Sequence, residues 1–207
     1  FSPAAPVKYS EMVVQIDSTG KDIDVLMNFV KEPQWIALPP WSSLRVTGQV
    51  SLKISEALLD GLDSGRLLLP VTVALHPISR DIVEFVLRYR VVGLKNEGKF
   101  STDSNGLENL EHHLIKDKRI EYSYQPVSRF IQIKDPVRNL KLTVLNDRAQ
   151  GGTSAQEGSV ELDISRANNG RDLKGMHDPL RERERLRLRH TVVVESAASS
   201  FFRLWQV

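Results

Sequence analysis

Hydrophobic and polar residues alternate along much of this chain, the pattern of β-strands with one buried face. The clearest runs are residues 45–54 and 81–91. Shorter runs cover residues 11–16, 22–30, 67–75, 129–133, 140–145, 159–164 and 190–195. About ten strands joined by short turns predict an all-β fold of packed antiparallel sheets, either a β-sandwich or a larger double sandwich.

Turn-forming residues separate these runs. They are Ser18-Thr19-Gly20, Pro39-Pro40, Asp63-Ser64-Gly65, Asp103-Ser104-Asn105-Gly106, Gly151-Gly152 and Asn168-Asn169-Gly170. Only residues 55–62 predict a helix, because Ile54, Leu58 and Leu62 would share one face and Ser55 would cap it. A weak domain boundary is expected near residues 94–98.

Composition narrows the class of protein. The 207 residues include no cysteine, so disulfides and thiolate ligands are excluded. Twenty-eight basic and 26 acidic side chains leave a net charge of +2, which gives no global attraction to nucleic acid or membrane. No apolar stretch is long enough to span a bilayer, and no signal peptide is visible. The chain begins at Phe1, which fits a fragment or a processed protein.

The usual catalytic and metal-binding patterns are missing from the sequence. The five histidines have no zinc-binding spacing, and a pair as adjacent as His112 and His113 points to opposite sides of a strand. No serine sits in a nucleophile elbow. Gly151-Gly152-Thr153-Ser154 lacks the lysine and the helix of a phosphate loop, so a glycine-rich hairpin is the expected structure. We expect no catalytic residue and no metal ligand in this chain.

Residues 181–189 alternate arginine with glutamate or leucine. As a strand they would place Arg181, Arg183, Arg185, Arg187 and Arg189 on one side. Such a face could bind phosphates, but no aromatic residue interleaves with it. A solvated edge strand protected by its charges explains the pattern equally well.

Three blocks of sequence resemble glycoside hydrolase family 38, the class II α-mannosidases. Residues 98–106 resemble the family's G-x-F-Y-T-D-S-N-G strand and turn, with Ser101 at the usual tyrosine position. Residues 122–127 resemble its N-Y-Y-P-V segment. Residues 140–162 are very similar to L-x-V-L-x-D-R-S-Q-G-G-S-S of the lysosomal branch. Within this block Asp147 and Arg148 are expected to pair or to bond local backbone.

The resemblance implies the C-terminal β-region of a zinc-dependent retaining α-mannosidase, a sandwich of the galactose-mutarotase-like supersandwich type. Residues 1–207 would form this β-sandwich region, and the catalytic domain with its zinc would precede Phe1. The implied partners are that catalytic domain and a mannose-containing glycan, with neither nucleic acid nor membrane. The implied location is the lysosome, the vacuole or the secretory pathway.

One loop is implied to reach the substrate. In the family an arginine before Gly-Val lines the mannose site; here Asp178-Pro179-Leu180 matches the anchor that follows, which places Lys174 at the arginine position. Asp172 is the one aspartate left of the family's pair. Both are candidate substrate-binding residues, although lysine lacks the planar fork of arginine.

Two other functions are open at this stage. The chain could be a non-catalytic carbohydrate-binding or adhesion module on the same sandwich. It could also be a protein-interaction scaffold that presents Trp35, Trp41 and Trp205, although tryptophans are more often buried.

Overall fold

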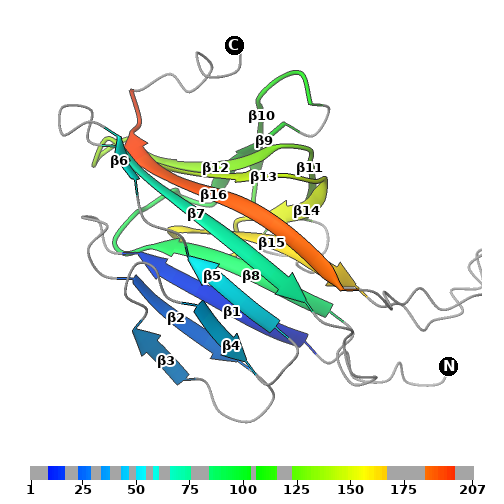
Figure 1. Cartoon of the computed structure of the whole chain (residues 1–207). Coiled ribbons are helices and arrows are strands. Elements are labelled where there is room, and N and C mark those ends of the chain that lie inside the picture. The colour runs from blue at the N-terminus through cyan, green and yellow to red at the C-terminus, as the bar shows by residue number, and fades with distance from the viewer. Residues whose placement is uncertain are drawn as a thin grey trace, which may run out of the picture.

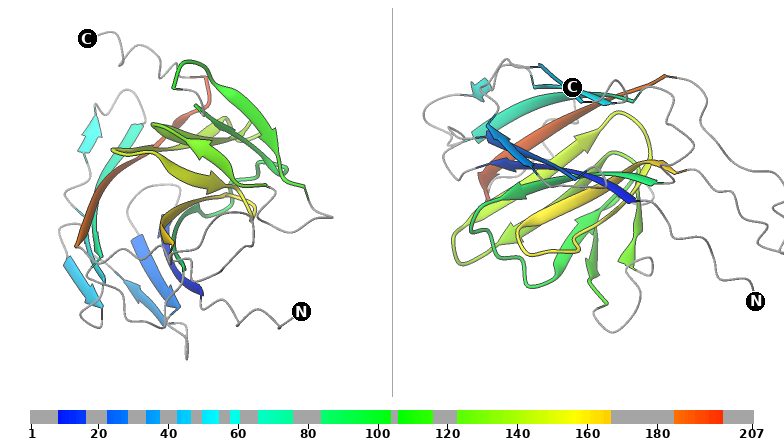
Figure 2. Two further views of the ribbon diagram at one scale, coloured as in Figure 1. Left: turned by 90° about the vertical axis from the view of Figure 1, so that its right-hand side faces the viewer. Right: turned by 90° about the horizontal axis from the view of Figure 1, so that it is seen from below.

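The computed structural model describes residues 9–16, 23–28, 34–37, 43–46, 50–54, 58–60, 66–75, 84–103, 106–115, 123–166 and 185–198. In these residues the chain forms two β-sheets that face each other across one core (Figures 1 and 2). Every strand pair is antiparallel except β1 with β8, which is parallel. The predicted all-β sandwich is therefore confirmed.

The first sheet has seven strands in the described part of the chain. In spatial order they are β11 (Gln125–Val127), β14 (Gln150–Thr153), β15 (Ser159–Arg166), β8 (Glu84–Val91), β1 (Tyr9–Ile16), β2 (Ile23–Asn28) and β3 (Gln34–Ala37).

The second sheet has nine strands in the described residues. Eight follow the order β10 (Leu110–His113), β9 (Lys99–Thr102), β12 (Phe130–Asp135), β13 (Leu140–Asn146), β16 (Leu186–Ser196), β7 (Arg66–Leu75), β5 (Val50–Ile54) and β4 (Ser43–Val46). The ninth, β6 (Leu58–Asp60), also pairs with β7. The boundary near residues 94–98 stays a prediction.

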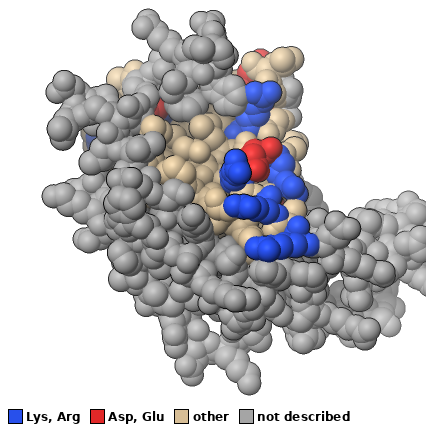
Figure 3. Space-filling view, in the orientation of Figure 1, with Lys and Arg blue, Asp and Glu red and all other residues tan. Residues whose placement is uncertain are grey.

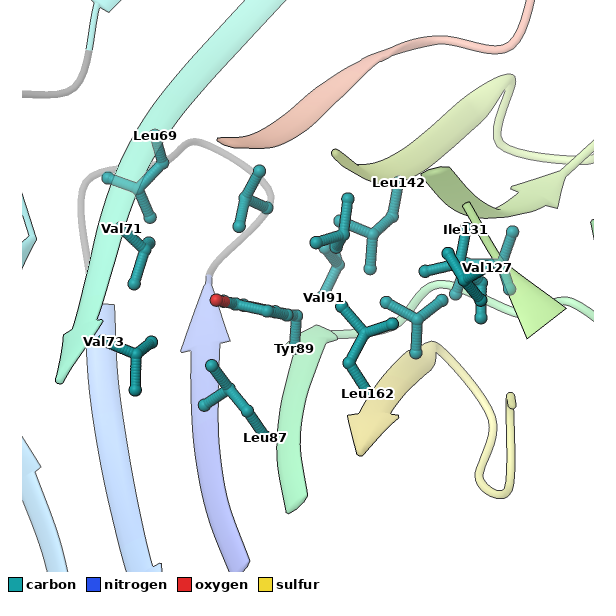
Figure 4. Close-up of a cluster of buried hydrophobic side chains, with 14 of the residues drawn as sticks. Leu69, Val71, Val73, Leu87, Tyr89, Val91, Val127, Ile131, Leu142 and Leu162 are labelled. Atoms are coloured by element: carbon teal, nitrogen blue, oxygen red, sulfur yellow. The ribbon is translucent and has the colours of Figure 1, made fainter. Parts of the chain in front are cut away.

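Alternate residues of the central strands fill the space between the sheets. Strand β8 contributes Phe85, Leu87, Tyr89 and Val91, and β7 contributes Leu69, Val71 and Val73 (Figure 4). All seven side chains are at most 1% exposed. Since burial of each such side chain is worth about 1.5–3 kcal/mol, this alternation is what sets the register of both sheets.

The helix predicted for residues 55–62 is wrong. Leu58–Asp60 forms strand β6, whose Leu58 pairs with Leu68 of β7. Strand β5 occupies the same edge of β7 farther along, opposite Val71–Leu75. The chain thus continues along an edge that still has unpaired backbone groups. A ladder there is more stable than an isolated helix of two turns that ends in glycine.

The run at residues 45–54 is two strands instead of one. Strands β4 and β5 pair antiparallel, with Val46 opposite Val50. Three residues separate these partners, and directly opposed residues share a face. The alternation of residue types therefore continues in phase from one strand to the next, and this concealed the hairpin.

Gly151 and Gly152 lie in strand β14, so the turn predicted for them is also wrong. A Cβ on Gly152 would lie 2.8 Å from Val127 Cγ2 and 3.1 Å from Ile131 Cδ1. Glycine is needed here for close packing against the core. The turn between β14 and β15 instead contains Gly158, whose φ of +71° favours glycine.

Candidate functional site

The loop that was predicted to contact substrate connects β15 with β16. Its two candidate residues, Lys174 and Asp172, lie outside the described residues. The same holds for Trp41, for Trp205 and for the side chain of Trp35. The strand residues that flank the loop are Arg166, which pairs with Glu84, and Leu186, which pairs with Leu75. Both ends lie on the same side of the molecule (Figure 1). The loop is thus anchored on one strand of each sheet.

The second anchor, β16, has the alternation that the arginine-rich sequence predicted. Leu186 and Leu188 are buried, whereas Arg185, Arg187 and Arg189 are exposed. Arg181 and Arg183 lie outside the described residues. From His190 onward β16 is an inner strand between β13 and β7. The arginine-containing part, Leu186–Arg189, pairs with β7 alone, which agrees with the edge-strand interpretation for these described residues.

A buried ion pair lies on the outer face of the seven-stranded sheet. Arg88 of β8 and Glu161 of β15 are directly opposed in register. Glu161 Oε2 accepts hydrogen bonds from Arg88 Nε and Nη2 at 3.0 and 2.6 Å. Glu161 Oε1 accepts a further hydrogen bond from the hydroxyl of Tyr124. This arrangement holds both oxygens of the carboxylate and ties β8, β15 and the segment before β11 together.

A second polar chain crosses the core from one sheet to the other. The Tyr89 hydroxyl lies 2.8 Å from Nδ1 of His190, and His190 Nε2 lies 2.9 Å from Oε1 of Gln150. An amide oxygen only accepts, so Nε2 carries the proton and Nδ1 accepts from tyrosine. Burial lowers the pKa of His190 to about 4, and the charge of Asp147 opposes this shift. Burial also raises the pKa of the Tyr89 hydroxyl.

This chain of three side chains resembles a catalytic relay in its chemistry, but its surroundings differ. His190 is 1% exposed and Tyr89 is fully buried. No substrate atom could reach either group without opening the core. We therefore assign it a structural role: it satisfies buried polar atoms and sets the relative position of the two sheets.

The other described histidines are also accounted for without a metal. His112 Nε2 is 2.9 Å from Thr102 Oγ1, and His113 lies 3.7 Å from Glu111. Burial lowers the pKa of His112. Across the described ranges, no three His, Asp or Glu side chains come close enough together to hold a metal ion. The zinc that the resemblance implies belongs to the catalytic domain, so the resemblance does not require a zinc site among these residues.

The described part of the chain also includes no helix with the length and hydropathy needed to cross a membrane.

Asp103, in the first of the three sequence blocks, links that block to the residues that directly follow the second block. Its Oδ1 accepts hydrogen bonds from the backbone amides of Ser128, Arg129 and Phe130 at 3.1, 2.9 and 3.0 Å. Asp103 is only 4% exposed. A carboxylate that gathers three amides fixes the entry into β12, so this residue explains a sequence signature by structure alone.

Asp147, in the third block, bonds the backbone of a residue distant in sequence and not the local backbone that was predicted. Its Oδ2 accepts from the amide of Arg189 at 3.0 Å, and its own amide donates to the carbonyl of Arg189 at 3.2 Å. It thereby extends the β13–β16 ladder beyond the last paired residues.

Comparison with known families supports this arrangement. The model of the glycosyl hydrolases family 38 C-terminal domain matches residues 16–170. The chain belongs to this family. The matched range includes all three sequence blocks and both polar clusters apart from His190, and it ends before Asp172 and Lys174.

Individual relatives of this family 38 chain point the same way. It is 37% identical over 118 residues to the human protein named lysosomal alpha-mannosidase, an alignment that covers 52% of this chain and 12% of that protein. The mouse protein of that name is 34% identical over 140 residues, 62% of this chain and 14% of the relative. Alpha-mannosidase E of Dictyostelium discoideum is 34% identical over 101 residues, 48% and 8% of the two chains. The matched part therefore spans only 8–14% of the length of these relatives.

Sequence reasoning missed the residues that hold this family 38 domain together. Arg88 and Glu161 are 73 positions apart, and Tyr89 and His190 are 101 apart. One signal was present: Arg88 stands between hydrophobic residues, Leu87 and Tyr89, in the middle of a strand.

Proposed function

We propose that this chain is the C-terminal β-domain of a zinc-dependent retaining α-mannosidase that removes terminal α-mannosyl residues from glycans. The catalytic residues and the zinc ligands would belong to a catalytic domain earlier in the same protein. The β-domain would pack against that domain and complete its active site. The family match over residues 16–170 carries this proposal.

The loop between β15 and β16 is the proposed contribution to the site. Lys174 would place its ammonium on a hydroxyl or ring oxygen of the mannose, and Asp172 would accept a hydrogen bond from a neighbouring hydroxyl. The anchors support this role, because β15 and β16 are central strands of two different sheets. A loop held at both ends by such strands can position a side chain reproducibly.

Substitution of Lys174 in the full-length enzyme tests this proposal. Lys174→Ala should lower kcat/KM for an α-mannoside by about ten- to a hundredfold, since a hydrogen bond from a charged group is worth about 1.5–3 kcal/mol. The matched control is Lys95→Ala, because Lys95 is an exposed lysine at the far turn after β8. Equal activity of wild type and Lys174→Ala would contradict the role of the loop.

We also propose a lysosomal, vacuolar or secretory location for the full-length protein, supported by the names of its relatives. A binding module without catalysis is the alternative outcome: the full-length protein would then bind a mannoside, or a protein partner, and cleave nothing.

A further inference from the structure

One part of β16 has a neighbouring strand on one side only. The strand pairs with β7 from Leu186 onward, whereas its pairing with β13 begins at His190. Asp147 extends the β13 side by one residue, to Arg189. No described residue continues this pairing opposite the three residues before it, Leu186–Leu188. We call the β13 side of these three residues the open edge.

The backbone of Arg187 directs its hydrogen-bonding groups toward the open edge. Both backbone groups of Arg189 face β13, because its amide donates to Asp147 Oδ2 and its carbonyl accepts from the amide of Asp147. Successive residues of a strand direct these groups to opposite sides, so those of Arg187 face the same way as those of Arg189. Leu186 and Leu188 direct theirs toward β7. A strand added at the open edge would therefore exchange two hydrogen bonds with Arg187.

The open edge is already fixed in the conformation of a paired strand. Leu186 and Leu188 are 5% and 0% exposed, so the inner face of this stretch packs in the core. Every residue from Leu186 to Val194 pairs in continuous register with β7. A preformed strand loses little conformational freedom when it binds. The open edge thus meets the requirements for addition of an extended segment from a partner.

The exposed arginines of this stretch restrict which strand can pair. Arg187 and Arg189 project from the outer face of the sheet, and basic side chains predominate among the described residues in Figure 3. Such charges protect an edge from indiscriminate pairing. Directly opposed residues share a face, and opposite charges there are favourable. The open edge therefore favours a strand with an aspartate or glutamate opposite Arg187, whereas a second copy of this edge would place arginine opposite arginine.

The position of the open edge indicates where such a strand would come from. Leu186 directly flanks the β15–β16 loop, which is the loop proposed to reach the mannose site. A domain that carries that site would lie beside this end of β16. The matched part spans only 8–14% of the relatives' length, so most of each relative lies outside it. A neighbouring domain of the same protein is thus the nearest source of a strand.

We propose that an acidic extended segment of the catalytic domain pairs with the open edge as an additional strand of the nine-stranded sheet. Its backbone exchanges two hydrogen bonds with Arg187, and one of its carboxylates lies opposite the Arg187 guanidinium. This interface rests on the function proposed above, because it requires a catalytic domain in the same protein. It adds the place and the chemistry of the contact between the two domains.

Amide hydrogen exchange, resolved to single residues by mass spectrometry, tests the proposal. In the full-length protein the Arg187 amide should exchange at least about a hundredfold more slowly than in the 207-residue chain, because only the full-length protein supplies its acceptor. The Leu188 amide faces β7, so it should be protected in both proteins. Protection of Leu188 reports that the strand is folded in each sample.

A charge reversal tests the acidic character of the partner strand. In the full-length protein Arg187→Glu should speed exchange of the amide at position 187 about tenfold, after correction for its intrinsic rate, because like charges then oppose each other. The matched control is Arg90→Glu, which makes the same change in net charge at an exposed arginine of β8. It should leave exchange of the Arg187 amide within about twofold of wild type.

Three results would overturn the proposal. The Arg187 amide could exchange as fast in the full-length protein as in the 207-residue chain, which would leave the edge unpaired. It could be protected equally in both, which would place the covering segment in this chain. The two charge reversals could also have equal effects. Release of mannose by the same full-length preparation tests the proposed function separately, since an active enzyme with an unprotected Arg187 amide would refute this interface alone.

Discussion

The hydroxyl of Tyr89 lies 2.8 Å from Nδ1 of His190 in the centre of the core, and each residue comes from a different sheet. The two rings meet edge to face, with centroids 5.7 Å apart. This contact makes the packing of the two sheets depend on a neutral histidine. It leads to a prediction about acid.

Acid should weaken the fold through His190. Its pKa is about 4 in the folded chain and 6.5 in the unfolded one. Below pH 6.5 the unfolded chain therefore binds a proton that the folded chain does not, and stability falls until pH 4, below which this contribution stays constant. The full loss is about 3 kcal/mol. Urea unfolding at pH 7, 5.5 and 4.5 measures it.

His190→Leu should remove this part of the pH dependence, whereas His113→Gln, at an exposed histidine, should leave it intact. The unfolding free energy of the wild type could change as little between pH 7 and 4.5 as that of His190→Leu. That result would contradict the claim that protonation of His190 weakens the fold.

Removal of the Asp103 carboxylate should destabilise the chain by about 2–3 kcal/mol. Asp103→Ala leaves the three amides of Ser128, Arg129 and Phe130 without their acceptor in a partly buried turn. Asp147→Ala is the matched control, because Asp147 is exposed and accepts a hydrogen bond from one amide. It should cost less than about 1 kcal/mol. Equal urea midpoints for the two variants would argue against the anchoring role of Asp103.

The two glycines of β14 should respond differently to alanine. Gly152→Ala should cost about 1–3 kcal/mol, because its Cβ would overlap the core at Val127. Gly151→Ala should cost much less, since its Cβ would meet Tyr124 Cδ1 at 3.4 Å, a separation the ring can accept. Thermal unfolding of both variants decides this, and a larger loss at Gly151 would refute the packing argument.

The Arg88–Glu161 pair should behave as one unit in a double-mutant cycle. Glu161→Gln removes the buried carboxylate that accepts two hydrogen bonds from Arg88, which should cost about 3–5 kcal/mol. Arg88→Met combined with Glu161→Leu should cost less than the single Glu161→Gln change, because no charge then remains buried. The cycle is closed by the single variants Arg88→Met and Glu161→Leu. A loss of stability in the double variant equal to the sum of their two losses would show that the side chains act independently.

The alternation of residue types was enough to predict the fold class and most central strands, since period two is the direct consequence of a half-buried sheet. It failed at short strands. Strands β3, β9, β10 and β11 have only three or four residues, and β6 was taken for a helix because Leu58 and Leu62 also fit a helical period. Pairing with β7 decided its structure, and that partner is not local in sequence.

The polar clusters were beyond local reasoning for a similar reason. Nothing near Tyr89 indicates that His190 will face it, because that encounter depends on the order of strands in two sheets. The alternation of arginine was visible in the sequence. The sequence did not show which residues of β16 have a neighbouring strand on both sides. Register with β13 and β7 supplied that answer.

The most direct test of the account compares two proteins: the full-length gene product and the 207-residue chain. Both are assayed with a chromogenic α-mannoside in the presence of zinc. We expect the full-length protein to release mannose and the chain alone to release none, because the catalytic residues are proposed to lie in another domain. Cleavage by the chain alone at the full-length rate, or no cleavage of any α-mannoside by the full-length protein, would contradict it.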